Sequence, residues 1–231
     1  MTQIYNMPYY DGKWENNMKN GKGNLYYNNG SIRYGGQWEN DKFHGEGKLY
    51  HQNGHICYDG QWKYNTMHGK CKYYDEYGYI EYEGQCENNM KSGHGISYRK
   101  DGAFVETIVD GIICYIDGRI FYVGQWENDM KNGEGKMYNE NGKLYYDGQW
   151  KNNLPHGQGK YYREDGTLIY EGQWENNMYN GKGKYYRDDG TIYYEGEFKN
   201  DVFCGQGRIY YKNGTIHGHV DGIWENNVFQ G

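Results

Sequence analysis

The stretch Tyr170-Glu-Gly-Gln-Trp-Glu-Asn-Asn-Met-Tyr-Asn-Gly-Lys-Gly183 decides the fold, because its pattern recurs along nearly the whole chain. We number each repeat from the glycine of its Tyr-x-Gly-x-Trp motif, which is Gly172 in this stretch, as position zero. These anchor glycines are Gly12, Gly36, Gly60, Gly84, Gly124, Gly148, Gly172, Gly196 and Gly222. They are 24 residues apart, except for 40 between Gly84 and Gly124 and 26 before Gly222. A fixed period of this length predicts a repeat architecture.

Other positions of the repeat are equally regular. Asparagine usually stands at +4, glycine at +9 and +11, tyrosine at +14 and +22, and Asn-Gly or Asp-Gly at +17 and +18. All seven tryptophans stand at +2, namely Trp14, Trp38, Trp62, Trp126, Trp150, Trp174 and Trp224. In the repeat anchored at Gly84, Cys86 takes that place.

The composition excludes several fold classes. The 231 residues include 37 glycines, 30 tyrosines and 2 prolines, and Ala103 is the sole alanine. Glycine at this density opposes helix, collagen requires glycine at every third residue and abundant proline, and 19% aromatic residues opposes disorder. The composition therefore indicates an all-β chain with many tight turns.

The charge and the cysteines limit the partners and the compartment. The formal net charge of −6 disfavours nucleic acid as a partner. The five cysteines, Cys57, Cys71, Cys86, Cys114 and Cys204, are scattered, odd in number and free of C-x-x-C, so we expect reduced thiols. The first residues lack signal-peptide features, and no apolar run is long enough to span a membrane. We expect a cytoplasmic protein, associated with the cytoskeleton or with a membrane surface.

Two turns in each repeat predict a continuous antiparallel meander. Asn-Gly between alternating apolar residues, as at Asn29-Gly30, predicts a two-residue type I′ turn that pairs +16 with +19 and +13 with +22. An asparagine-rich loop at +5 to +8 is expected to be the second turn, pairing position zero with +13 and +2 with +11. The predicted fold is an elongated, solenoid-like single antiparallel β-meander.

This register puts the aromatic residues and the strand glycines on one face. Trp38 is expected to lie opposite Gly47 of its own repeat and beside Gly21 of the repeat before. The glycines would then make room for the indole. The structural residues of the repeat are therefore predicted to be the seven tryptophans with Gly45, Gly47, Gly157 and Gly159.

One segment interrupts the array. We expect a single array over residues 1–231, regular at about 9–102 and 119–231, with an irregular hydrophobic segment at about 103–123. Asp110-Gly111 and Asp117-Gly118 predict two added hairpin turns, with a strand at 112–116. The segment is either a bend that buries its own apolar residues or a patch for a partner or for self-association, formed by Phe104, Ile108, Ile112 and Tyr115.

No constellation suits catalysis or a metal. His44, His68 and His156 share position +8, but neighbouring repeats would hold them about 9–10 Å apart, too far for one ion. We therefore expect no catalytic residues, no metal and no cofactor. The apolar residues at +6, including Met90, Met130 and Met178, fit either a loop contact or an adaptable binding edge.

The unit at 170–183 resembles the MORN repeat, and the resemblance covers nearly the whole chain. It departs from the family in its 24-residue period and in the Asn-Asn or Asn-Asp dipeptide at the first turn. The resemblance implies a β-hairpin array that acts as a scaffold in cytoskeletal, ciliary or membrane–cytoskeleton assemblies. We expect a non-enzymatic scaffold presenting an aromatic face to protein partners; the alternatives are a peripheral phospholipid-binding protein and an accessory subunit of an enzyme. The bias toward Asn, Lys, Tyr and Ile suggests an AT-rich genome, as in a protist, a large DNA virus or some bacteria.

Overall fold

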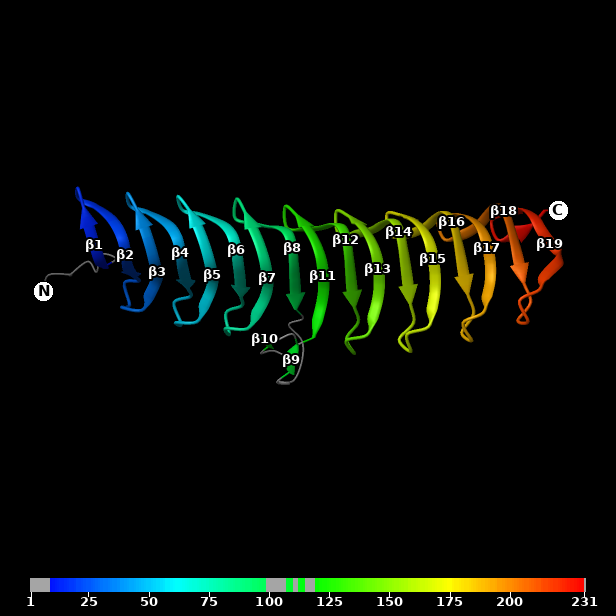
Figure 1. Ribbon diagram of the computed structural model, residues 1–231, viewed down its shortest axis with the longest axis horizontal. Coiled ribbons are helices and arrows are strands. Elements are labelled where there is room, and N and C mark those ends of the chain that lie inside the picture. Colours follow the sequence, from blue (N-terminus) through cyan, green and yellow to red (C-terminus); the bar gives the residue numbers. More distant parts are fainter. Residues whose placement is uncertain (1–8, 99–106, 110–111, 115–118, 231) are drawn as a thin grey trace, which may run out of the picture. The chain divides into compact units, whose positions relative to one another are not determined.

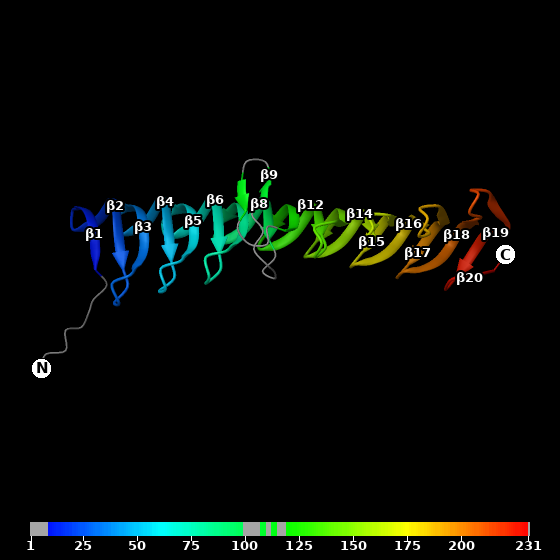
Figure 2. The ribbon, with the colours of Figure 1, turned by 90° about the horizontal axis from the view of Figure 1, so that it is seen from below.

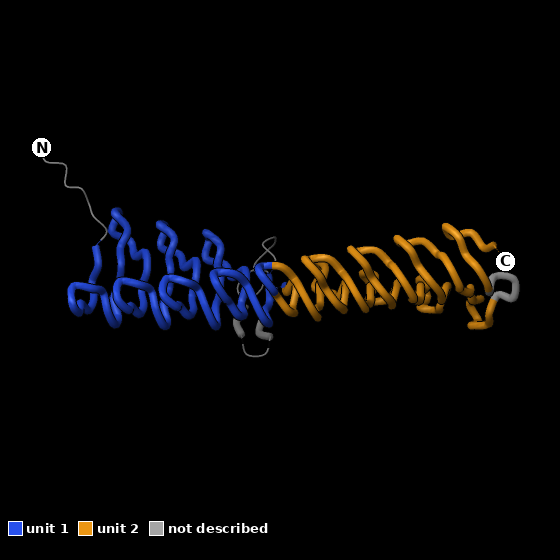
Figure 3. Tube along the Cα trace, turned by 90° about the horizontal axis from the view of Figure 1, so that it is seen from above, with its two compact units in different colours: residues 1–119, 127–129 blue, residues 120–126, 130–231 orange. Residues whose placement is uncertain are grey.

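The computed structural model describes residues 9–98, 107–109, 112–114 and 119–230, and every regular element in them is a β-strand (Figure 1). The chain divides into two compact units, residues 1–119 with 127–129 and residues 120–126 with 130–231 (Figure 3). In each unit consecutive strands pair antiparallel as hairpins. This confirms the predicted all-β hairpin array.

The strands are long and evenly matched. The first unit holds β1 (Tyr10–Glu15), β2 (Met18–Tyr26), β3 (Ile32–Glu39), β4 (Lys42–Tyr50), β5 (Ile56–Lys63), β6 (Thr66–Tyr74), β7 (Ile80–Glu87), β8 (Met90–Tyr98), β9 (Thr107–Val109) and β10 (Ile112–Cys114). The second holds β11 (Ile120–Glu127), β12 (Met130–Tyr138), β13 (Leu144–Lys151), β14 (Leu154–Tyr162), β15 (Leu168–Glu175), β16 (Met178–Tyr186), β17 (Ile192–Lys199), β18 (Val202–Tyr210), β19 (Ile216–Glu225) and β20 (Val228–Phe229). Figure 2 shows the strands of each unit side by side.

The asparagine-rich turn is shorter than predicted. Glu39 pairs with Lys42, so only Asn40 and Asp41 form the turn. Their φ angles are 49° and 65°, as a type I′ turn requires at both central residues. All the non-glycine residues with positive φ in the described parts of the chain lie at +4 or +5. The predicted loop at +5 to +8 is therefore wrong, because asparagine and aspartate accept the left-handed conformation well enough to close a two-residue turn.

The Asn-Gly turn is longer than predicted. The Gly30 amide donates to the Tyr27 carbonyl, and the Tyr27 amide donates to the Ser31 carbonyl. Only Gly30 has positive φ there, and Tyr26 pairs with Ile32. This is a type I turn followed by a glycine in the left-handed region, so the predicted type I′ turn and the pairing of +16 with +19 are wrong.

The shorter first turn changes the register on one side of each odd-numbered strand. Gly36 pairs with Gly47 rather than with Leu49, and Trp38 pairs with Phe43 rather than with Gly47. On the other side, the predicted pairs of Gly36 with Gly23 and of Trp38 with Gly21 are confirmed. A β-bulge after Gly36 takes up the residues that the short turn leaves over.

Tyrosine, not tryptophan, covers the glycines. A side chain added at Gly47 would strike the Tyr34 ring, and one added at Gly36 would strike the Tyr34 hydroxyl and the Gly47 backbone. Tyr34 is completely buried and donates its hydroxyl proton to the Gln37 carbonyl at 2.9 Å. The same holds along the array, where the fully buried residues are Tyr34, Tyr58, Tyr82, Tyr122, Tyr146, Tyr170 and Tyr194. The assignment of Gly47 and Gly159 to the indole is thus corrected: Gly159 makes room for Tyr146.

Each strand bends at its anchor glycine. The Tyr34 and Trp38 ring centroids are 5.1 Å apart, whereas four residues of straight strand span about 13 Å. The bend folds the aromatic face inward, and Tyr34 also stacks on Phe43 with a centroid distance of 3.8 Å. The resulting aromatic core excludes water from a sheet that has no second layer.

The tryptophans link one repeat to the next. The Trp62 indole Nε1 donates to the Gly47 carbonyl at 3.0 Å, and Trp150 bonds Gly135 in the same way. Six tryptophans are 3–8% exposed, whereas Trp14 in β1 is 54% exposed. The +9 glycines serve the backbone instead: Gly45 and Gly157 have φ of 59° and 64°, and a side chain on either would meet a glutamine, not an indole.

Two cysteines replace this link at one junction. Cys71 takes the place of a +11 glycine and Cys86 that of a tryptophan, and a disulfide joins them between β6 and β7. The expectation of reduced thiols is therefore wrong for this pair, because the two repeat positions are neighbours in space. Cys57 and Cys204 are free and half-buried.

The irregular segment forms a small sheet of its own. β9 pairs antiparallel with β10, with Val109 opposite Ile112. The predicted turns at 110–111 and 117–118 lie outside the described residues. β10 covers residues 112–114 of the predicted strand at 112–116, and the rest of that prediction lies outside the described residues. The β9–β10 pair is a two-stranded sheet separate from the hairpin array.

Candidate interaction surface

The aromatic face is the core of each unit and is not available to a partner. The tryptophan and +22 tyrosine rings pack edge-to-face against each other, as Tyr146 does against Trp174 at 5.2 Å. Both residues are at least nine-tenths buried. The prediction of an aromatic face presented to partners is thus corrected, because the bend at the glycines closes that face on itself.

The remaining predicted interaction residues fall in different settings. Phe104 and Tyr115 lie outside the described residues. Ile108 and Ile112 belong to β9 and β10, of which the backbone pairing alone is described. Met90, Met130 and Met178 are half-buried at the first positions of β8, β12 and β16, and the structure does not bring them into one cluster.

The opposite face of the sheet is polar. We call it the polar face; it carries the residues at −1, +1, +10 and +12, which alternate with the core residues along each strand. Lys160 at +12 lies 3.5 Å from Glu171 at −1, and Lys184 lies 3.5 Å from Glu195. The same pair recurs as Lys136 with Asp147 at 3.0 Å.

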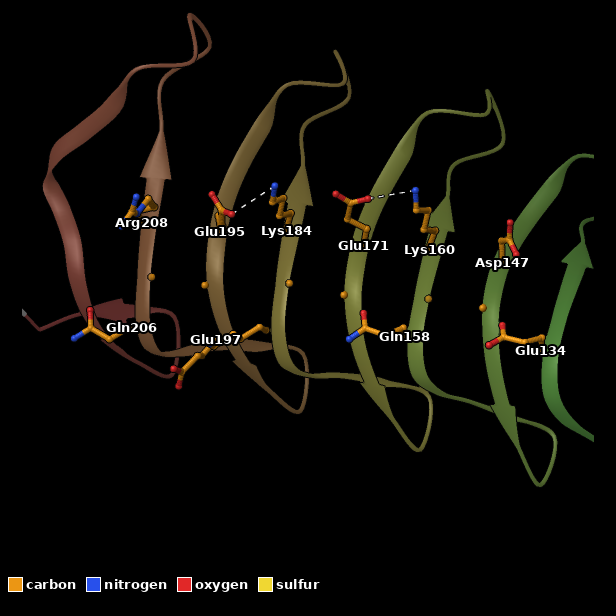
Figure 4. Close-up of a pocket in the computed structure, with 17 residues that line it drawn as sticks. Glu134, Asp147, Gln158, Lys160, Glu171, Lys184, Glu195, Glu197, Gln206 and Arg208 are labelled. Carbon is orange, nitrogen blue, oxygen red and sulfur yellow. Dashed lines mark ion pairs between the residues drawn. The ribbon is translucent and has the colours of Figure 1, made fainter.

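A hollow lies on this face of the second unit. We call it the polar trough; it extends across β12 to β18 and has a volume of about 940 Å³. Figure 4 shows the Lys–Glu pairs in one row, Gln158, Glu134 and Gln206 in another, and glycines between the rows. The glycines leave the backbone uncovered between two walls of charged and amide side chains.

Hydrogen bonds hold the acidic wall in place. The Tyr210 hydroxyl donates to Glu195 Oε2 at 2.6 Å and, with Lys184, lowers the pKa of that carboxyl. The Tyr186 hydroxyl donates to Glu171 in the same way at 2.7 Å. The Asp147 carboxylate raises the pKa of Lys136 through their hydrogen bond. The trough therefore offers acidic, basic and amide side chains that hydrogen bonds and ion pairs hold in place.

The described residues can also be compared with what a metal site and a membrane-spanning helix require. In the described residues no three histidine, cysteine or acidic side chains come together as a metal site would require. Within those same residues, no helix has the length and apolar character needed to cross a bilayer.

The fold and the polar face define a class: tandem β-hairpin repeats of 24 residues, joined through a shared aromatic core. The profile of the MORN repeat matches eight segments, residues 10–32, 34–56, 58–76, 82–104, 122–143, 146–168, 170–192 and 194–216. The chain therefore belongs to the MORN repeat family, whose repeats serve as scaffolds. No curated protein matches the chain in sequence.

The sequence held an unused signal for the polar trough. The confirmed pairing of +11 with the next anchor glycine places +12 opposite the next −1, and these positions are lysine and an acid in five junctions. The five pairs are Lys48–Asp59, Lys72–Glu83, Lys136–Asp147, Lys160–Glu171 and Lys184–Glu195. The ladder of ion pairs was predictable, whereas the hollow beside it depends on the bend at the glycines.

Proposed function

We propose that this chain is a non-enzymatic scaffold that docks an extended polypeptide of a partner protein in the polar trough. The observation that supports it is the trough itself, whose walls are ion pairs and amides and whose floor is glycine backbone. Peptide backbone needs such donors and acceptors, because its own amides and carbonyls lose water on docking. The aromatic face is occupied internally, so the polar face is the surface left for recognition.

The repeat spacing favours an extended chain. Successive repeats are two strands apart, about 9.6 Å. A polypeptide in the polyproline II conformation advances about 9.3 Å in three residues. A chain lying across the strands would therefore present every third side chain to an equivalent set, such as Lys160 with Glu171 and then Lys184 with Glu195. A charged side chain of the peptide at these positions would find an opposite charge in each Lys–Glu pair of the trough.

A displayed library of random twelve-residue peptides, selected on the full chain, tests this proposal. We expect selected peptides to lose binding to a Lys160→Ala/Lys184→Ala variant and to keep it for Lys48→Ala/Lys72→Ala, the matched control in the first unit. Both sets of lysines pair with acids on the polar face, so they perturb the fold equally. No enrichment, or equal loss in both variants, would refute docking in the trough.

A parallel arm uses vesicles containing phosphatidylserine. Salt-sensitive co-sedimentation that depends on Lys160 and Lys184, without peptide selection, would assign the surface to lipid instead. The net charge of −6 opposes this outcome.

A further inference from the structure

Lysine stands at the +7 position in three repeats, as Lys19, Lys91 and Lys131. This position normally packs an apolar or aromatic side chain in the core, as Phe43 and Tyr179 do against Tyr34 and Tyr170. In β12 the residue is Lys131, whose side chain enters the core in place of a ring. Its ammonium lies 4.7 Å from the Phe121 ring centroid, 5.4 Å from Tyr122 and 4.8 Å from Trp150.

A cage of rings stabilises a cation but does not replace water or a counter-ion fully. Among the described residues, no carboxylate lies within ion-pair distance of Lys131. Tyr122 is the titratable group that faces it from β11, and it stays neutral because burial raises its pKa. From β13 it is faced by Trp150, and on β12 its amine lies 3.7 Å from the Met137 sulfur. Burial therefore lowers the pKa of Lys131 to about 8.

The first repeat contains the same arrangement with one difference. Lys19 also stands at +7, 5.3 Å from the Trp38 centroid, but its ammonium lies 3.6 Å from the Asp41 carboxylate. In both places the +5 residue of the next repeat accepts the lysine amide: Asp41 Oδ1 from Lys19 at 2.9 Å, and Asn153 Oδ1 from Lys131 at 2.8 Å. The backbone hydrogen bond is shared, and Asn153 leaves Lys131 without the carboxylate that Asp41 places beside Lys19.

We propose that Lys131 is a site of covalent acylation by thioesters. We further propose that this reactivity depends on Asn153, because the equivalent residue beside Lys19 is the acidic Asp41. The neutral amine adds its lone pair to the thioester carbonyl carbon and forms a C–N bond. The C–S bond then breaks, the thiolate leaves, and the nitrogen gives its extra proton to solvent. The products are an amide and a thiol, and no other reactant is needed.

The protonation state sets the expected selectivity. At pH 8 about half of the Lys131 side chains carry a free lone pair, against roughly one in 250 for an ordinary lysine. Part of this advantage is lost because a less basic amine is a weaker nucleophile. We expect acylation of Lys131 to be about tenfold or more faster than that of Lys19 at pH 8.

The test is a time course of the full chain with a small acetyl thioester, S-acetyl-N-acetylcysteamine, with site occupancy read by peptide mass spectrometry. Asn153→Asp should slow Lys131 about tenfold and move its rate profile to higher pH. Asp41→Asn should accelerate Lys19. Asn177→Asp is the matched control, because its amide bonds Pro155 and no lysine stands at that +7 position. Aspartate at +5 occurs naturally at Asp41 and Asp201, so these variants retain the fold.

Each outcome decides the proposal. Lys131 labelling no faster than Lys19 at pH 8 would overturn it, because the amine would then be too enclosed to meet a thioester. Fast labelling that is unchanged by Asn153→Asp would overturn the role of Asn153. Fast labelling of Lys131 that Asn153→Asp suppresses and Asn177→Asp leaves unchanged would establish both parts.

Discussion

The junctions between β4 and β5 and between β6 and β7 share one register but are filled differently. In the first, Trp62 packs beside β4 and bonds the Gly47 carbonyl. In the second, Cys71 and Cys86 hold those two positions and are joined by a disulfide. Strand pairing is otherwise identical, so the register does not depend on tryptophan. The two positions instead form one volume that a ring with a glycine, or two linked sulfurs, can fill.

The comparison also separates the two uses of glycine. Cys71 occupies a +11 position without positive φ, so glycine is not needed there for its conformational freedom. Tyr58 and Tyr82 stay fully buried on either side of the substitution. The buried tyrosine is therefore the constant part of the core, and the +2 residue is the variable part.

The largest expected effect tests the constant part. Burial raises the pKa of each of the seven fully buried tyrosines, while an unfolded tyrosine ionises near pH 10. The unfolded chain then binds fewer protons above about pH 10, so the stability that is complete below that pH falls as pH rises. We expect alkaline unfolding from about pH 10, measured as the urea midpoint between pH 8 and 11.5. A midpoint that stays constant to pH 11.5 would contradict tyrosine burial.

The second-largest loss of stability is expected from truncating the tryptophan at +2. Trp62→Ala leaves a cavity and the Gly47 carbonyl without its donor, and we expect a loss of about 3–5 kcal/mol in the free energy of unfolding. Trp14→Ala is the control, because that side chain is 54% exposed and should cost far less. Equal losses in urea titrations of the two variants would show that the shared aromatic core is not what stabilises the junction.

Overfilling the space under a tyrosine is a separate test. Gly159→Val would place methyl groups on the Tyr146 ring, and we expect a cost of about 3 kcal/mol. Gly166→Ala faces open space in a turn and should cost about 1 kcal/mol through its positive φ alone. A double-mutant cycle should couple Gly159→Val to Tyr146→Leu and not to Trp150→Leu; the reverse coupling would restore the original assignment of this glycine to the indole.

A further test replaces the disulfide of the β6–β7 junction with the tryptophan and glycine of the other junctions. Cys86→Trp alone should destabilise the chain by about 1–3 kcal/mol, because it breaks the disulfide and puts an indole beside the unpaired Cys71 side chain, which overfills the junction. Adding Cys71→Gly should recover the loss. A reductant should lower the melting temperature of the wild type, since the disulfide closes a loop with a separation of 15 residues worth about 3 kcal/mol. The double variant should not respond; if it does, another pair of cysteines is linked.

The smallest effect concerns the two turns. Asn176 has a φ of 50°, so Asn176→Ala should cost about 1 kcal/mol, while Asn176→Gly should be nearly neutral. Asp165 precedes the glycine of the other turn and lacks positive φ, so Asp165→Gly should bring no such relief and should lose the bond to the Thr167 amide. If thermal melts rank the two glycine variants the other way, the turn types are reversed.

The sequence indicated the fold class and half of the register correctly. The 24-residue period and the positions of tryptophan and tyrosine were enough to predict a hairpin array, and the pairs of Gly36 with Gly23 and of Trp38 with Gly21 followed from the Asn-Gly turn position. The other half was wrong because Asn-Gly is the commoner sequence for a type I′ turn, whereas here Asn-Asn and Asn-Asp form it. Because the first turn was predicted two residues too long, the +11 glycines were assigned to the tryptophan ring, whereas they lie against the tyrosine ring.

The interaction surface was less predictable than the fold. Alternation assigned the aromatic residues to one face correctly, but it could not show that each strand bends at its glycine and closes this face. The bend depends on contacts such as that between Tyr34 and Trp38, four residues apart, which an extended strand would forbid. The link between Cys71 and Cys86 lies in the half of the register that was predicted correctly, because Cys71 pairs with Gly84 and Cys86 with Gly69. It was missed because the cysteines were taken as scattered along the chain and were not placed on that register.

The bond from each indole to the carbonyl of the preceding repeat has a consequence for how such a chain can lengthen or shorten in evolution. Trp150 completes the repeat that contains Gly135, and Trp174 completes the one that contains Gly159. A duplication or deletion of a whole 24-residue module among those joined by tryptophan therefore restores an intact joint at the splice. A deletion of 23 residues would instead shift every later side chain to the opposite face. Selection on this one contact would preserve the length of the genetic unit.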